Sequence, residues 1–214
     1  MRARAKSSFL PGRAVKLFTA GLLAAAGGAL AAEVTVDVRS SDGLPLADAV
    51  VFLESPAARA ALRPLRGTEI EQAERRFTQR VTVVPVGSEA QFPNRDKVRH
   101  HVYSFSPAKT FELKLYIGTP ANPVLFDRPG IAVLGCNIHD SMIAWVVVVE
   151  TPHHGLTAAP GRVRLADVPP GSYRLRTWHP ALPPGAPALD QPLVVPAAGA
   201  AATVQLPLAA AQAS

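Results

Sequence analysis

Apolar and polar residues alternate with a period of two in several short segments of the chain, which is the pattern of half-buried β-strands. The clearest examples are residues 33–39 (EVTVDVR), 110–116 (TFELKLY) and 173–178 (YRLRTW). Residues 143–150 (IAWVVVVE) form a nearly continuous apolar run, which indicates a strand buried on both faces. Further strands are expected at residues 49–53, 81–86, 90–92, 101–105, 131–134, 162–165, 191–195 and 203–206. Glycine and proline residues separate these segments, so we predict an all-β sandwich.

The first 32 residues have the pattern of an export signal and are not expected to be part of the fold. Five basic residues and no acidic residue precede an apolar run from about Leu17 to Leu30. The run ends in the small-residue sequence ALAA before Glu33, which fits a cleavage site. A membrane span needs about 20 residues, so the short run favours a cleaved signal over an uncleaved anchor. We therefore expect a periplasmic protein with no membrane span after processing.

Removing this leader changes the charge and cysteine arguments. The whole chain carries a net charge of +6, but the leader supplies five of the positive charges, so the remainder is close to neutral. It contains no dense basic patch, and a nucleic-acid-binding role is therefore not indicated. Cys136 is the only cysteine and cannot pair within the chain. In an exported protein, such a cysteine indicates an intermolecular disulfide, a reactive thiol or a metal ligand.

The most informative motif is the sequence CNIHDSM, which lies between two predicted strands. It places the Cys136 thiol, the His139 imidazole and the Met142 thioether within seven residues, so a loop could direct all three to one ion. These are donors that copper prefers, and two imidazoles and a thiolate with a weak axial thioether form a blue-copper site. The second imidazole would come from another strand, where His100 and His101 are the candidates. Each residue alone is more often a core or surface residue than a ligand.

Around these residues the sequence resembles the cupredoxins, the plastocyanin-like and amicyanin-like blue copper proteins. In that family a strand and a glycine lead to an asparagine-containing stretch and then to a histidine. Here residues 83–87 (VVPVG) and 92–94 (FPN) precede His100 in that order. The spacing Cys-x-x-His-x-x-Met is similar to the short ligand loop of amicyanin. The resemblance covers about residues 68–150. The sequence is also similar to small exported proteins that are labelled methylamine-utilisation proteins.

The resemblance implies one type 1 copper ion, with His100, Cys136 and His139 as strong ligands and Met142 as the axial ligand. The family usually has an asparagine after the first histidine, whereas this chain has His101. We therefore expect the hydrogen bonds that support the ligands to differ from those of the family. Adjacent residues of a strand point to opposite faces, so only one of the two histidines can bind. Strand periodicity does not decide between them, and the motif favours His100. The sequence does not decide between copper and zinc.

The segments that flank this region resemble a different family. Residues 34–53 and 161–178 are similar to the opening and later strands of transthyretin-like or carboxypeptidase-regulatory-like sandwiches. The alternative is one enlarged sandwich with a single core. The expected organisation is a signal peptide (1–32), the first part of a small transthyretin-like sandwich (33–55), a linker (56–67), a cupredoxin-like Greek-key domain (68–150), the remainder of the transthyretin-like sandwich (151–207) and a tail (208–214).

Taken together, the resemblance implies a monomeric protein that carries single electrons and is not an enzyme. Its partners would be redox proteins such as a c-type cytochrome or a periplasmic dehydrogenase. Two alternatives stay open, namely copper handling in the cell envelope and a non-redox binding module. The pair His153 and His154 is expected in an exposed loop, where it could bind a second metal. His179 is expected to be structural.

Overall fold

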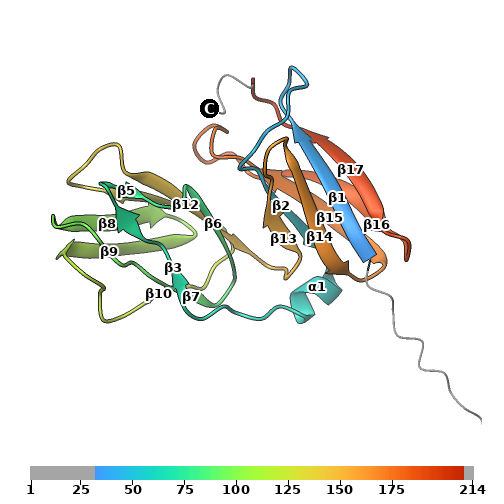
Figure 1. Ribbon diagram of the computed structural model, residues 1–214. Helices are drawn as coiled ribbons and strands as arrows, with labels where there is room; N and C mark the ends of the chain where they lie inside the picture. The colour runs from blue at the N-terminus through green and yellow to red at the C-terminus, as the bar shows by residue number, and fades with distance from the viewer. Residues whose placement is uncertain (1–31, 210–214) are drawn as a thin grey trace, which may run out of the picture.

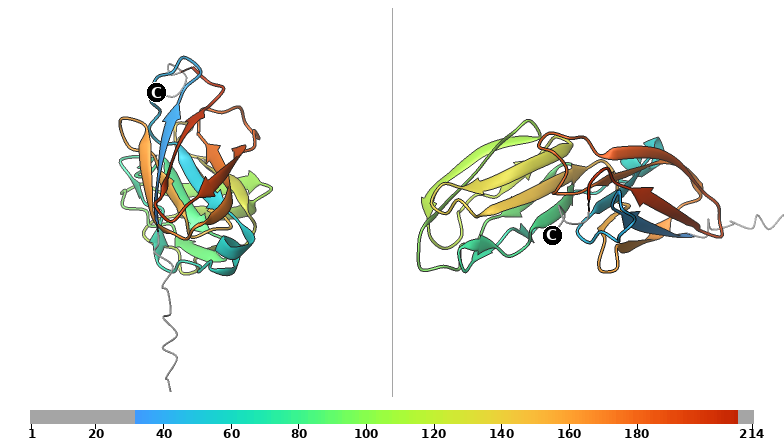
Figure 2. Two further views of the ribbon diagram at one scale, coloured as in Figure 1. Left: turned by 90° about the vertical axis from the view of Figure 1, so that its right-hand side faces the viewer. Right: turned by 90° about the horizontal axis from the view of Figure 1, so that it is seen from above.

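The computed structural model describes residues 32–209, so all of the predicted signal peptide except Ala32 lies outside the described residues. The described chain is almost entirely β-structure, and its one helix, α1 (Pro56–Ala60), is short. The strands form two sandwiches that lie side by side (Figure 1, Figure 2). The predicted all-β sandwich class is therefore confirmed. Within residues 32–209, no helix has the length and apolarity that a membrane span requires.

We call one of the two units the flank sandwich, because its strands come from both ends of the described chain. They are β1 (Ala32–Arg39), β2 (Val50–Glu54), β13 (His154–Leu156), β14 (Arg162–Val168), β15 (Gly171–Trp178), β16 (Leu189–Val195) and β17 (Ala200–Gln205). One sheet has the order β14-β1-β17 and the other the order β13-β2-β15-β16. Strand β1 pairs in parallel with β17, so the first and last strands of the described chain are neighbours. The alternation predicted for β1 is present, since Val34, Val36 and Val38 are fully buried.

The other unit, the central sandwich, contains the segment with the cysteine motif. Its strands are β3 (Thr68–Glu69), β4 (Gln72–Ala73), β5 (Arg76–Phe77), β6 (Val81–Pro85), β7 (Ser88–Gln91), β8 (His100–Ser106), β9 (Lys109–Tyr116), β10 (Val124–Phe126), β11 (Gly130–Cys136) and β12 (Ile143–Val149). The main sheet has the order β6-β12-β11-β8-β9, and a smaller sheet has the order β10-β7-β3. Strands β4 and β5 form a separate hairpin.

Strand β12 lies between the cores of the two sandwiches. Its residues Val146 and Val148 belong to the core of the central sandwich, whereas Val147 and Val149 belong to the core of the flank sandwich. The ring of Trp145 lies 6.3 Å from that of Trp178 on β15, measured between centroids. Successive side chains of a strand point to opposite faces, so each face of β12 serves one core. This explains the continuous apolar run and confirms its predicted burial on both faces.

The junction between the first part of the flank sandwich and the central sandwich contains α1. The side chain of Ser55 caps this helix by accepting a hydrogen bond of 3.1 Å from the backbone N–H of Ala58. Pro56 occupies the first turn, where its missing N–H costs nothing. The helix ends after one turn, before Pro64 and Gly67, residues that do not favour a longer helix. The chain then reaches the central sandwich within a few residues.

Strands with enough residues to show periodicity were predicted close to their observed bounds. Strands β3, β4 and β5 contain two residues each, and β10 and β13 contain three, which is too few for a repeating pattern. His154 belongs to β13, and both histidines are partly buried, so the prediction that the pair His153 and His154 lies in an exposed loop was wrong. The ring of His153 packs edge-on against Tyr173, with centroids 6.2 Å apart.

His179 connects two loops of the flank sandwich from a fully buried position. Its Nδ1 accepts a hydrogen bond of 3.0 Å from the N–H of Ala181, so Nε2 carries the proton and donates to the carbonyl of Ala47 at 3.1 Å. Burial lowers the pKa of His179 below its ordinary value of 6.5, and the nearby Arg80 adds to this effect. The prediction that His179 is structural agrees with these contacts.

We therefore expect the free energy of unfolding to fall as the pH is lowered from 7.5 to 5.5. The unfolded chain binds a proton at His179 below pH about 6.5, whereas the folded protein binds it only at a lower pH, so acid favours the unfolded state. His153 and His154, whose pKa values burial also lowers, add to the effect. Urea denaturation at several pH values should show a weaker pH dependence for His179→Gln than for the wild type. Equal pH dependence in both proteins would contradict this role of His179.

Candidate metal centre

Two neighbouring strands and one loop of the central sandwich bring the predicted ligands together. Strands β8 and β11 are antiparallel, and Cys136 at the end of β11 pairs with Val102 on β8. The start of β8, with His100, therefore lies beside the end of β11. The loop that follows bends back, because the N–H of Met142 donates a hydrogen bond of 3.0 Å to the carbonyl of His139. This turn returns His139 to the cysteine from which the loop started.

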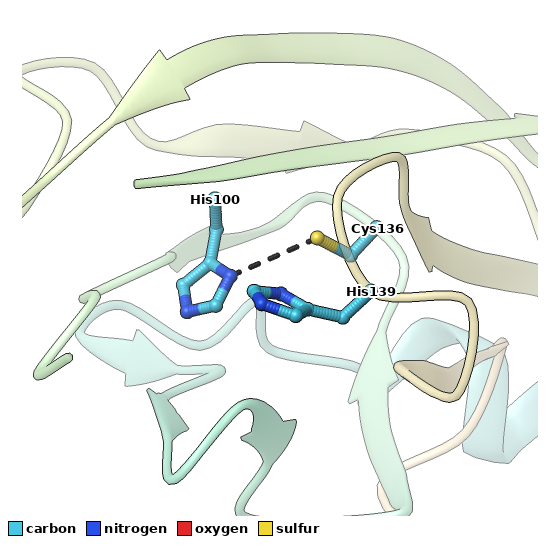
Figure 3. A group of neighbouring side chains, drawn as sticks. All are labelled: His100, Cys136 and His139. Atoms are coloured by element: carbon cyan, nitrogen blue, oxygen red, sulfur yellow. Dashed lines mark hydrogen bonds between the residues drawn. The ribbon is translucent and has the colours of Figure 1, made fainter. Parts of the chain in front are cut away.

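His100, Cys136 and His139 form one compact cluster (Figure 3). Each offers one ligand atom, and the three ligand atoms lie within 4.8 Å of one another. The Sγ of Cys136 lies 3.7 Å from Nδ1 of His100, and the two imidazole rings have centroids 5.1 Å apart. Two nitrogens and one sulfur that bind one ion, each at about 2.0–2.3 Å, can be no further apart than about twice that distance. The side chains are therefore close to a ligating arrangement.

The cluster is largely buried, and one of its ring nitrogens has no hydrogen-bond partner among residues 32–209. His100 is fully buried, Cys136 is 4% exposed and His139 is partly exposed. The Nδ1 atom of His139 is buried but has no hydrogen-bond partner within residues 32–209. A buried polar atom without a partner costs free energy and calls for an explanation. A metal ion bound by this nitrogen would supply one, and the thiol and two imidazoles are donors compatible with copper.

The position of Met142, the fourth predicted ligand, follows from its burial and from its backbone hydrogen bond. Its side chain is 1% exposed and belongs to the same apolar cluster as Cys136, in the core of the central sandwich. Its backbone N–H fixes the turn at His139, as described above. These contacts place Met142 near the end of the loop beside the cluster. Its role as an axial ligand stays a prediction.

The adjacent histidines of β8 have different surroundings. His100 points inward to the cysteine, whereas His101 lies on the other face, where its Nε2 is 2.8 Å from Oε1 of Glu112. The ring of His101 also contacts that of Tyr103. The alternation expected along a strand thus separates the two rings, and His100 is the one that joins the cluster.

An acidic residue that the sequence analysis did not select completes the site. Oδ2 of Asp96 lies 2.8 Å from Nε2 of His100, on the side of the ring away from Cys136. Burial raises the pKa of Asp96, but hydrogen bonds from the N–H of Arg75, from His100 and from the N–H of Glu74 outweigh it and lower the pKa below its ordinary value. Asp96 is therefore ionised at neutral pH. A search for an acidic residue close before a candidate histidine would have found it.

No protein-family model matches the chain, and no curated protein matches it. Among solved structures, an amicyanin variant in the reduced state is 23% identical over 48% of this chain and 99% of its own length, with a TM-score of 0.35. The novel purple cupredoxin from Nitrosopumilus maritimus is 18% identical over 40% of this chain and all of its own, with a TM-score of 0.33.

A third structure is the copper-containing nitrite reductase of Thermus scotoductus SA-01, which is 23% identical over 41% of this chain, with a TM-score of 0.37. The match spans only 23% of the reductase. All three similarities cover less than half of the chain at TM-scores below 0.5, so the chemistry of the site rests on its own geometry. The solved structures to which this chain is similar include cupredoxins.

Proposed function

We propose that this protein is a periplasmic type 1 copper protein that carries single electrons between redox partners. The observation that supports this function best is the cluster of His100, Cys136 and His139, with a buried imidazole nitrogen that has no partner. Two imidazoles and one thiolate suit copper in both oxidation states, and a weak axial thioether completes such a site. Met142, which follows in the same loop, is the proposed axial ligand.

In this proposal the protein side chains are arranged before the metal binds. A bound copper ion would supply the one-electron couple. His100 and Cys136 come from adjacent strands of one sheet, so their separation is fixed by backbone hydrogen bonds and not by a flexible loop. Their burial excludes water, which keeps polar solvent from reorganising when the charge changes. His139 is the one member of the cluster that is partly exposed, so it would connect the site to the surface.

The partners follow from the same chemistry. The neighbour of His139 in the loop, Ile138, is 48% exposed and would add apolar surface beside the partly exposed ligand. A redox protein such as a c-type cytochrome or a periplasmic dehydrogenase would dock there. We further propose that the protein acts as a monomer, that it is not an enzyme and that the leader directs it to the periplasm.

The first test is the visible absorption spectrum of the purified protein after addition of Cu(II). Direct thiolate–Cu(II) bonding gives an intense visible band, which we expect in the wild type and not in Cys136→Ser. Reversible voltammetry of the copper-loaded protein should then show the one-electron couple. No band in a protein whose Cys136 is still reduced would overturn the proposal. Rapid loss of copper to a chelator, without reversible redox chemistry, would indicate copper handling instead.

A further inference from the structure

The carboxylate of Asp96 is held between the candidate metal centre and a neighbouring hairpin. Its Oδ1 accepts a hydrogen bond of 2.8 Å from the N–H of Glu74, and its Oδ2 accepts one of 2.9 Å from the N–H of Arg75. The same Oδ2 contacts Nε2 of His100 at 2.8 Å. The side chain of Asp96 is 16% exposed, so these contacts are largely shielded from water. Asp96 thus joins the β4–β5 hairpin to the histidine.

The hairpin turn has an unusual backbone for its residues. Glu74 and Arg75 both have positive φ angles, 53° and 57°, and neither is glycine. Two-residue hairpin turns with two positive φ angles strongly favour Asn-Gly or Asp-Gly, because other residues are strained there. Such strain persists only where the surrounding structure stabilises it, and it is frequent at functional sites. Here the two N–H groups of the strained turn both donate to Asp96.

The loop that contains Asp96 is also fixed from its other side. Asn94 is 3% exposed, and its Oδ1 accepts a hydrogen bond of 2.9 Å from the N–H of Asp96. Its Nδ2 donates to the carbonyls of Val98 and Tyr116, at 2.9 Å and 3.0 Å. The hairpin therefore fixes the carboxylate of Asp96, and Asn94 fixes its backbone. Held in this way, the carboxylate can keep the ring of His100 in one orientation.

We propose that Asp96 is a positioning residue of the copper site, which fixes the tautomer of His100 and lowers the reduction potential of the bound copper. Oδ2 of Asp96, which also accepts from the N–H of Arg75, accepts a hydrogen bond from Nε2–H of His100, which leaves the lone pair of Nδ1 directed to the side where Cys136 lies. A carboxylate on the second nitrogen also makes an imidazole a stronger donor. A stronger donor stabilises Cu(II) more than Cu(I), and the potential falls. This inference rests on the proposed function.

The contact between His101, on the other face of β8, and Glu112 on β9 offers a matched control. Glu112 contacts His101 at the same distance of 2.8 Å, but outside the cluster. Glu112→Gln therefore removes a similar carboxylate–histidine contact without touching the proposed ligands. Asp96→Asn removes the charge that faces His100. Because Asp96→Asn also weakens the support of the strained turn, it is combined in a second variant with Glu74→Gly and Arg75→Gly, which relieve the positive φ strain.

The experiment compares these variants in two ways. In the copper-free protein, nitrogen NMR of His100 should show the Nε2–H tautomer in the wild type and Glu112→Gln, and a mixture of tautomers in both Asp96 variants. In the copper-loaded protein, the Asp96 variants should bind Cu(II) about 10- to 100-fold more weakly than Glu112→Gln, and their potential should be higher. Unchanged tautomer and unchanged potential in the Asp96 variants would overturn the inference. Because the NMR comparison needs no copper, it decides whether Asp96 fixes the tautomer of His100 even if the wild type binds none.

Discussion

Replacing His100 by alanine is expected to abolish the visible thiolate–Cu(II) band, whereas replacing His101 by alanine should leave it intact. Only the His100 ring belongs to the cluster with Cys136 and His139, while the His101 ring lies on the other face with Glu112. Losing one of three strong donors removes the trigonal arrangement on which the band depends. Absorption spectra of both variants with added Cu(II) provide the measurement.

Circular dichroism of the two variants serves as the control, because both substitutions lie in β8 and should leave the sheet intact. The opposite pattern, with the band lost in His101→Ala and kept in His100→Ala, would show that the chain presents the other histidine to the metal. A band kept in both variants would exclude either histidine as a required ligand.

Replacing Val147 by aspartate is expected to lower the free energy of unfolding by about 3–5 kcal/mol, the range for an uncompensated buried charge. Val147 is 2% exposed and packs into the core of the flank sandwich from a strand of the central sandwich. A charge there would be desolvated by both units. Urea denaturation monitored by tryptophan fluorescence would report the change, because Trp145 and Trp178 lie at this contact.

Ile143→Asp is the matched control, since Ile143 lies four residues earlier on the same face of β12 and is 48% exposed. This variant should change the stability by no more than about 0.5 kcal/mol, as is usual for surface positions. Equal stabilities of the two variants would mean that the two sandwiches do not pack against each other in solution.

The longer strands could be predicted from the sequence because their burial alternates, as in β1, or is continuous, as in β12. The cysteine motif could be found because its three donor side chains lie within one loop. The choice between His100 and His101 needed the alignment to a family motif. The strand pattern shows that the two side chains point to opposite faces, but not which face carries the metal. The structure adds the reason for the difference, which is the pairing of β8 with β11.

The turn that supports Asp96 could not be predicted in the same way, although Asp96 itself lies only four residues before His100. The turn between β4 and β5 contains Glu74 and Arg75, which carry no signal for positive φ angles. The strands on either side have two residues each, too few to show a hairpin pattern. The contact between the hairpin and the loop at Asp96 spans about twenty residues and depends on tertiary packing. Sequence patterns report local periodicity, and this part of the site has none.

The two-sided burial of β12 has a consequence for how its alignment within the sheet is encoded. A slip of one residue would exchange the inward and outward faces of a strand. Four consecutive valines, residues 146–149, would tolerate such an exchange, because each core would again receive valines. The residues before them would not, since Ala144 is 1% exposed and Trp145 stacks with Arg80. The size difference between alanine and tryptophan therefore selects the correct alignment, whereas the four valines are compatible with either alignment.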